Sequence, residues 1–291
     1  MRSGRWVRAG AALLVVGACT QKPAEQLPPE CDQEGPQTDA GQGGGVPVAW
    51  MGAVRVAESR DHKSGAAVTG SVAASFYDVS NYAVEAPQAL DLSPTCRGIT
   101  GQPATTGTRT ALGVDRVEVS GTVGGAVTLS APDGGSLSHS TAGAVLGADG
   151  VAVNVVGRDG GFVNGGVAAM VPPAPMLLSS PDLSGAGHVG DSDVVVRWQA
   201  GTDPAALVSV ELTTGAGSAQ TRATIQCVVK DDGCHVVPSG ALTWMTAGRS
   251  EPITVVVKRN VSTAVLLAAP VDGGAGLVMT LSQEARGELL P

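Results

Sequence analysis

Cysteine is the residue type in this chain whose positions say most about chemistry. Cys19 follows an N-terminal segment of 18 residues, and four more cysteines come after it. A thiol can carry a lipid, form a disulfide or bind a metal. The chain has no CxxC pair, the usual spacing of a cysteine metal site, and His235 is the only histidine next to a cysteine. We therefore expect no metal and no cofactor, and assign the thiols to lipid attachment and disulfides.

The first 18 residues have the three parts of an export signal. Three arginines within the first eight residues precede an apolar run at 9–16, which is too short to span a bilayer, and two small residues precede Cys19. This order resembles the lipobox of bacterial lipoproteins, in which the cysteine is acylated and becomes the new first residue. The resemblance implies a diacylglycerol, often with a third acyl chain, on Cys19, enough for stable anchoring. The alternative is an ordinary signal peptide with a coincidental cysteine.

With one cysteine lipidated, four remain, and an even number outside the cytoplasm predicts two disulfides. Three pairings are possible. We favour Cys31–Cys96 and Cys227–Cys234, because each pair then stays within one region of the chain. For the second pair, the Asp-Asp-Gly sequence at 231–233 is expected to reverse the chain and to form the acidic tip of a hairpin.

No other constellation predicts a catalytic site. Residues 185–190 match the GxGxxG pattern, but they lead into a valine-rich strand, whereas a dinucleotide site needs a helix there. The histidines, His62, His139, His188 and His235, stand among Gly, Ser and Asp residues, which predicts surface loops. The chain also lacks the GxSxG, HExxH and P-loop motifs.

Composition favours β-structure and argues against a nucleic-acid partner. The net charge is −8, and removing the three arginines of residues 1–18 leaves about −11, with no basic patch. The chain has 41 glycines and only 3% aromatic residues, and Val and Ala supply most of its apolar mass. Valine and threonine suit pleated sheets, and glycine penalises helix interiors.

The chain divides into a tether and two β-rich parts. Residues 19–46 are rich in Pro, Gln, Gly and acidic residues, which predicts a flexible tether with a mean reach of roughly 30 Å. The rest is expected to be all-β, as two sequential β-sandwich domains at 47–171 and 175–291. Prolines at 172, 173 and 175 mark the boundary, because proline cannot donate to a β-ladder.

Short strands with a period of two recur throughout both parts. Val151, Val153 and Val155 are typical, and Asp-Gly turns, such as Asp159-Gly160, separate the strands. Trp198 looks like the central tryptophan of an immunoglobulin-like sandwich, which is an analogy of fold alone. One helical turn is predicted at 239–245, with Ser239 as its cap.

Residues from about 110 to 285 resemble a family of exported lipoproteins from GC-rich Gram-negative bacteria. The resemblance rests on the lipobox, the tether, a sandwich-like domain, the proline-rich joint at 171–175, and a second domain with Trp198, Cys227 and the segment from Val237 and Pro238 to Leu242. The family implies tandem β-sandwich domains and offers no activity to carry over.

Two classes of function fit these observations. We favour a lipid-anchored protein of the cell envelope, in the outer membrane and facing the periplasm or the surface. Its role would be non-enzymatic binding, adhesion or scaffolding toward a protein or polysaccharide, which predicts an exposed apolar or aromatic patch. The alternative is a hydrolase acting on an envelope or extracellular polymer, which predicts a concave pocket with converging acids or a histidine near a serine.

Overall fold

Alternating apolar residues form β-strands throughout the part of the chain that the structure describes. The computed structural model describes residues 31, 48–84, 89–101, 105–131, 133–181, 183–188, 192–203, 206–214, 223–247 and 251–290. The predicted signal at 1–18, the lipidation site Cys19 and all of the predicted tether except Cys31 lie outside these residues. Within them the chain is mostly strand, with a single short helix, so the all-β prediction is confirmed at this level.

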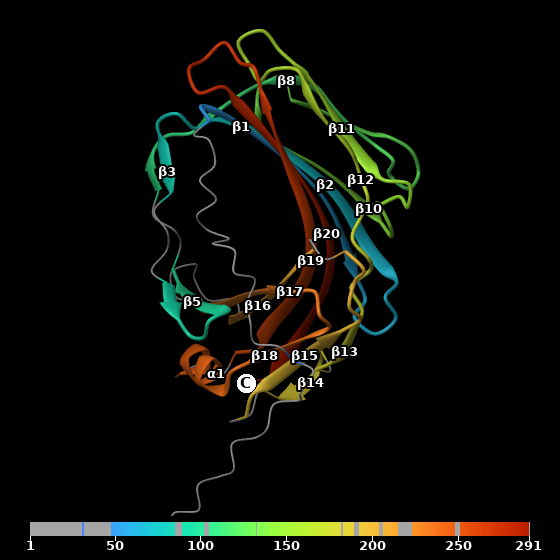
Figure 1. Ribbon diagram of the computed structural model, residues 1–291, viewed down its shortest axis with the longest axis vertical. Coiled ribbons are helices and arrows are strands. Elements are labelled where there is room, and N and C mark those ends of the chain that lie inside the picture. Colours follow the sequence, from blue (N-terminus) through green and yellow to red (C-terminus); the bar gives the residue numbers. More distant parts are fainter. Residues whose placement is uncertain are drawn as a thin grey trace, which may run out of the picture.

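One long, curved sheet of eleven strands organises the molecule (Figure 1). Its strand order is β10-β2-β1-β20-β19-β16-β17-β5-β4, while β14 also pairs with β20 and β7 with β2. β1 and β20 are parallel, and the other neighbours in this order are antiparallel. The bounds are β1 (Trp50–Arg60), β2 (Ala67–Asp78), β4 (Ala89–Asp91), β5 (Cys96–Thr100), β7 (Thr110–Ala111), β10 (Gly135–Ala142), β14 (Ser184–His188), β16 (Leu207–Thr214), β17 (Ala223–Lys230), β19 (Ile253–Leu267) and β20 (Ala275–Leu290).

Smaller elements cover one face of this sheet and its margins. A four-stranded sheet has the order β12-β11-β8-β9, a three-stranded sheet the order β13-β15-β18, and β3 pairs with β6. The bounds are β3 (Tyr82–Val84), β6 (Thr105–Gly107), β8 (Val114–Ser120), β9 (Val127–Ala131), β11 (Val151–Gly157), β12 (Gly165–Met170), β13 (Leu178–Ser180), β15 (Val194–Trp198), β18 (Cys234–Val237) and α1 (Ser239–Thr246).

The predicted helical turn is confirmed as α1, but its predicted cap is wrong. Pro238 occupies the N-cap position, and Ser239 is the first helical residue. The backbone N–H of Ser239 instead donates to the carboxylate of Asp193 at 2.7 Å, which satisfies a donor that the helix leaves open. The cap therefore comes from a residue 46 positions away in the sequence.

Two apolar cores lie on the same face of the long sheet. The first core fills the space under the four-stranded sheet and includes Val54, Val72, Phe76, Val117, Val153 and Phe162. The second core lies under the three-stranded sheet and α1 and includes Val196, Trp198, Val210, Ile225, Leu242 and Val255. β20 serves both, because Leu277 and Met279 belong to the first core, and Ala285 and Leu289 to the second.

A row of polar side chains crosses the sheet between the two cores. Glu58 on β1 is opposite Gln283 on β20, and Gln283 is opposite Arg259 on β19. All three are buried, and all three stand at positions that face the core side of the sheet. The Gln283 side-chain amide donates to Glu58 Oε2 at 3.1 Å. This polar row separates the two cores without interrupting the sheet.

The proline-rich segment at 171–175 lies at the level of this row. Arg259 Nη1 donates to the carbonyl oxygens of Ala174 at 2.8 Å and Pro175 at 3.0 Å. Arg259 Nη2 donates to the carbonyl of Gln199 at 2.6 Å. A guanidinium offers five donors in a rigid plane, so one buried arginine holds three segments of chain together.

The predicted boundary at 171–175 therefore does not separate the sheets. Strands from both sides of it share the long sheet, and β1 pairs with β20 over 11 residues, from Trp50↔Ala275 to Arg60↔Ala285. The structure contains several sheets that do not divide clearly into two sandwiches. The period-two pattern could not reveal this, because it fixes which face of a strand is buried but not which strand lies beside it.

Many local predictions are confirmed. Val151, Val153 and Val155 are all buried in the first core. Asp159-Gly160 lies in the turn between β11 and β12, and Asp272-Gly273 lies in the turn between β19 and β20. Both glycines have a positive φ, 73° and 93°, a conformation that β-carbon-bearing residues rarely adopt.

Candidate functional site

The two disulfides join different cysteines from those we favoured. Cys96 bonds to Cys227, and Cys31 bonds to Cys234. The prediction of two disulfides among these four residues is confirmed, and the favoured pairing is wrong. Cys96–Cys227 joins the two predicted β-rich parts across 131 residues, and Cys31–Cys234 joins the predicted tether to the second part across 203 residues.

Strand pairing explains why Cys227 and Cys234 do not meet. β17 has β16 on one edge and β5 on the other, so no edge is free for the strand that follows it. The chain leaves β17 at Lys230 and pairs with β15 in the three-stranded sheet instead. On the β5 edge, Cys96 lies directly opposite Cys227, with a Cα–Cα distance of 4.0 Å.

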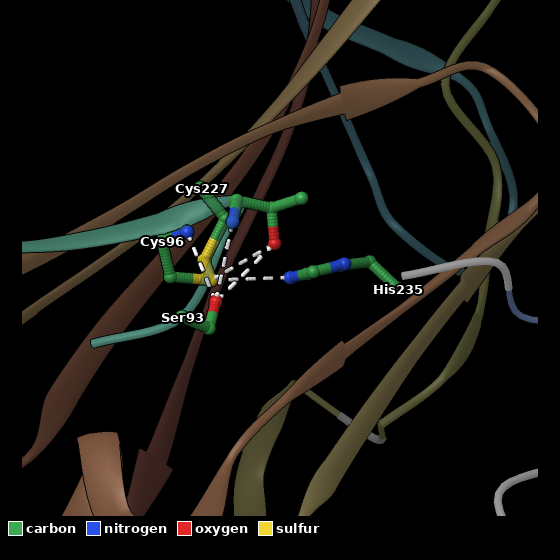
Figure 2. The surroundings of a disulfide bond; sticks show 5 residues. Ser93, Cys96, Cys227 and His235 are labelled. Atoms are coloured by element: carbon green, nitrogen blue, oxygen red, sulfur yellow. Dashed lines mark hydrogen bonds between the residues drawn. A yellow bond between two sulfur atoms is a disulfide. The ribbon is translucent and has the colours of Figure 1, made fainter. Parts of the chain in front are cut away.

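Figure 2 shows His235 beside the Cys96–Cys227 disulfide. The His235 Nε2 atom lies 3.2 Å from Cys96 Sγ. On the other side, the Ser93 hydroxyl oxygen accepts the backbone N–H of Cys96 at 3.1 Å. Cys234 and His235 are adjacent on β18, and successive side chains of a strand point to opposite faces. One strand thus contacts both disulfides.

Among the three histidines whose burial the structure describes, His235 departs furthest from the predicted surface position. Its side chain is 1% exposed, and burial lowers its pKa from 6.5 to about 4, because the charged imidazolium loses its solvation. The imidazole is therefore neutral at pH 7. By contrast, His62 lies in the turn after β1, and His139 lies on the exposed edge strand β10.

Cys96, Cys227 and His235 lie close enough together to bind one metal ion, but the disulfide prevents the two cysteines from acting as ligands. Cys96 Sγ, Cys227 Sγ and a His235 ring nitrogen lie within 4.8 Å of one another. Metals bind the thiolate form of cysteine. Both sulfurs are bonded to each other here, so the cluster acts as a buried cross-link with a neutral imidazole packed against it.

Asp231 is a buried ion-pair partner, not the exposed hairpin tip that we predicted. Its carboxylate lies 2.6 Å from Arg259 Nε and accepts hydrogen bonds from Arg259 Nη2 at 2.8 Å, the Trp198 indole at 2.8 Å and the Gly201 N–H at 3.0 Å. A β-carbon at residue 201 would overlap this carboxylate, so the close approach requires glycine. Trp198 is a core tryptophan as predicted, 4% exposed.

The second candidate site is a groove on the face of the long sheet that is turned away from both cores. Figure 1 shows the sheet curving so that this face is the hollow one. The groove has a volume of about 850 Å³, and the residues that line it come from seven consecutive strands, β10 to β17 in sheet order. At about 4.8 Å per strand, it extends roughly 29 Å across the sheet.

Small polar side chains dominate the lining of this groove. Its hydroxyl and amide groups belong to Ser75, Ser136, Ser138, Ser209, Gln226, Asn260, Ser262 and Thr280. Methyl groups of Ala53, Ala73 and Val278 lie between them. In the sequence, this surface corresponds to the Ser, Thr and Ala residues that alternate with the buried valines along each strand. We did not identify these positions as a site.

The charged side chains that line the groove are paired. Lys258 Nζ donates to Glu211 Oε2 at 2.7 Å, and Arg55 forms an ion pair with Glu284. The groove therefore combines many hydrogen-bonding groups with a balanced charge.

The groove matches neither of the two surfaces expected from the sequence. It is concave, as the hydrolase hypothesis requires, but its lining includes one carboxylate, Glu211, and no histidine among the described residues. The binding hypothesis predicted an exposed apolar or aromatic patch, and here the surface is polar. The aromatic Trp50 is buried in the first core.

No protein-family model and no curated protein matches this chain in sequence. The family resemblance described above therefore remains a prediction. In the ranges that the structure describes, no helix is both long and apolar enough to cross a bilayer.

Proposed function

We propose that this chain is an exported, lipid-anchored protein of the bacterial cell envelope that binds a neutral polysaccharide in the groove of its long sheet. The groove is the observation that carries the proposal. Hydroxyl and amide groups complement sugar hydroxyls, which both donate and accept hydrogen bonds. The methyl groups between them suit the apolar faces of sugar rings, and the paired charges favour a neutral ligand over a charged one.

The length of the groove favours a polymer over a small molecule. Seven strands contribute to it, and its extent of roughly 29 Å across the sheet exceeds the size of a compact ligand. The sheet is rigid along this direction, because its strands are hydrogen-bonded side by side. A preformed polar surface reduces the entropy that is lost when a ligand binds.

Two features support an exported and anchored protein. The N-terminal segment has the charge, the length and the cysteine position of a lipoprotein signal. The two disulfides indicate folding in an oxidising compartment, because cytosolic proteins keep their thiols reduced. Outer-membrane placement is the localisation that we propose.

A bulky side chain in the groove tests the binding site. We expect Thr280→Trp to reduce retention of the lipid-free protein on insoluble envelope polysaccharide at least tenfold. Thr280 lines the groove on the central strand β20. The matched control is Thr128→Trp on β9, an exposed strand position outside the groove. Equal retention of the two variants and the parent protein would contradict the proposed site.

Cell fractionation tests the anchor separately. We expect Cys19→Ala to leave the protein unprocessed or to release it from the membrane fraction. Mass spectrometry of the mature N-terminus should show acyl chains on Cys19. An unmodified Cys19 in an otherwise mature, membrane-free chain would rule out lipid anchoring.

A further inference from the structure

The Cys31–Cys234 disulfide places a second attachment point at one end of the molecule. Cys31 is 7% exposed and packs with Cys234 and Val236, so the bond is part of a small apolar cluster on β18. β18 belongs to the sheet that covers the second core, to which the last part of β20 also contributes. In Figure 1 this is the lower end of the molecule.

The next residue that the structure describes, Val48, lies at the opposite end of the molecule. Val48 packs against Gly276, and Trp50 pairs with Ala275, the first residue of β20. β20 has 16 residues, which corresponds to about 50 Å along its curved path. Figure 1 shows the start of β1 at the upper end, away from β18. Cys31 is therefore attached at the β18 end of the molecule, and Val48 lies at the end where β20 begins.

The number of residues between Cys19 and each attachment point limits how far that point can lie from the lipid anchor. Cys31 follows Cys19 by 12 residues, and a fully extended chain of that length spans about 40 Å. Val48 follows Cys19 by 29 residues, which span at most about 100 Å. With the disulfide, the β18 end can lie at most about 40 Å from Cys19. Without the disulfide, the nearest attachment point is Val48 at the opposite end, and it can lie up to about 100 Å from Cys19.

We propose that the Cys31–Cys234 disulfide makes the β18 end of the protein the end that faces the lipid surface. This inference rests on the proposed function, because it requires a membrane anchor at residue 19. The disulfide shortens the anchor and selects the membrane-facing end. The disulfide then limits how far the groove, which extends over both halves of the sheet, can lie from the membrane.

Energy transfer to acceptor lipids tests this orientation. A fluorescent amino acid is encoded at Thr243, exposed on α1 beside the second core, or at Asp272, exposed in the β19–β20 turn at the other end. The lipidated protein is reconstituted in vesicles that contain an acceptor lipid. We expect at least twofold more transfer from Thr243 than from Asp272. In the variant Cys31→Ser/Cys234→Ser, the ratio of transfer from Thr243 to transfer from Asp272 should fall to one or below.

Two further variants test separately the loss of the disulfide and the length of the anchor. Cys31→Ser alone breaks the same bond and serves if the double variant fails to fold. Insertion of 20 Gly/Ser residues between 20 and 30 keeps the bond and should bring the ratio toward one. The same ratio in the parent protein, the cysteine variants and the insertion variant would overturn the inference.

A separate arm distinguishes failure of the anchor from failure of the orientation. The chain from residue 20, with an N-terminal hexahistidine tag, is bound to vesicles with a nickel-chelating lipid and the same acceptor. This arm does not depend on natural lipidation. If it shows the predicted ratios while native protein does not float with vesicles, the lipid anchor is wrong and the disulfide constraint stands. If native protein floats but neither arm shows a difference between the two labels, the orientation is wrong.

Discussion

The first and second cores share strands β19 and β20 but bury charge in different ways. At the border of the first core, Glu58 Oε1 accepts the backbone N–H groups of Val145 and Leu146 at 2.8 and 2.6 Å. Glu58 Oε2 accepts from Arg60 at 2.6 Å. The side chain of Arg60 is 16% exposed, so this buried carboxylate has a counter-ion that reaches solvent.

At the border of the second core, both members of the ion pair are sealed. The side chains of Arg259 and Asp231 are 1% and 3% exposed. The second core also contains the Cys96–Cys227 disulfide and contacts His235, whereas no residue of the first core, as far as the structure describes it, is a cysteine.

The difference shows two ways to stabilise the core of a protein that has few aromatic residues. The first core relies on apolar packing and one carboxylate with a solvent-connected partner. The second uses cross-links and a fully enclosed ion pair. Removing one partner of such a pair leaves an unpaired charge in a nonpolar interior, so the second core should be more sensitive to single substitutions.

The largest effect is expected from the disulfide. Cys96→Ala/Cys227→Ala reopens a link between positions 131 residues apart, which the chain-entropy model values at about 5 kcal/mol. Urea unfolding should show this loss in the free energy of unfolding. Because β19 and β20 run through both cores, hydrogen exchange of β11 and β18 amides should accelerate together. Faster exchange in β18 alone would show that the cores unfold separately.

The enclosed ion pair comes next. Arg259→Met leaves the buried Asp231 carboxylate without its counter-ion and removes the donor to three carbonyl groups, and we expect a loss of about 3–5 kcal/mol in the free energy of unfolding. Adding Asp231→Leu should recover much of it, because no unpaired charge then remains. A loss below about 1 kcal/mol for Arg259→Met would show that the pair is not enclosed in solution.

Acid should destabilise the protein through His235. Between pH 6.5 and about 4 the unfolded chain binds a proton on this histidine that the folded chain does not. Stability is therefore complete above pH 6.5 and falls as the pH is lowered, by about 3 kcal/mol at pH 4. Chemical denaturation across this range measures the slope.

The control for this slope is His235→Phe, which keeps a planar ring but does not titrate. Its stability should change less between pH 6.5 and 4. Hydrogen bonds, chiefly from the Ser64 N–H and the Ser80 hydroxyl, hold the pKa values of Asp61 and Asp78 below 3.8, so these two carboxyls titrate below this window. Equal slopes for the parent and His235→Phe would place the acid sensitivity elsewhere.

The smallest effect is expected at the first core. Glu58→Gln keeps an oxygen for the two backbone N–H groups but turns an amide toward the Arg60 and Gln283 donors. We expect a loss of about 1–3 kcal/mol, because Arg60 can turn to solvent. Denaturation of Glu58→Gln and Arg259→Met under one condition compares the two borders directly. A larger loss for Glu58→Gln would reverse the comparison.

The sequence by itself determined the local features of this protein. Alternating apolar residues predicted the strands and their buried faces, Asp-Gly pairs predicted turns, and an even cysteine count predicted two disulfides. Each of these properties depends on neighbouring residues or on composition. The same alternation puts Cys227 on one strand face with Ala223 and Ile225, and all three are buried.

Only the tertiary structure decided which distant residues meet. The β1–β20 pairing, the Cys96–Cys227 register, the Arg259–Asp231 ion pair and the buried His235 all join residues that no local pattern connects. The physical reason is that a strand's alternation specifies its faces, while its edges are backbone groups that any other strand can pair with. The groove arises in the same way, since only the curvature of seven paired strands brings its hydroxyl groups onto one surface.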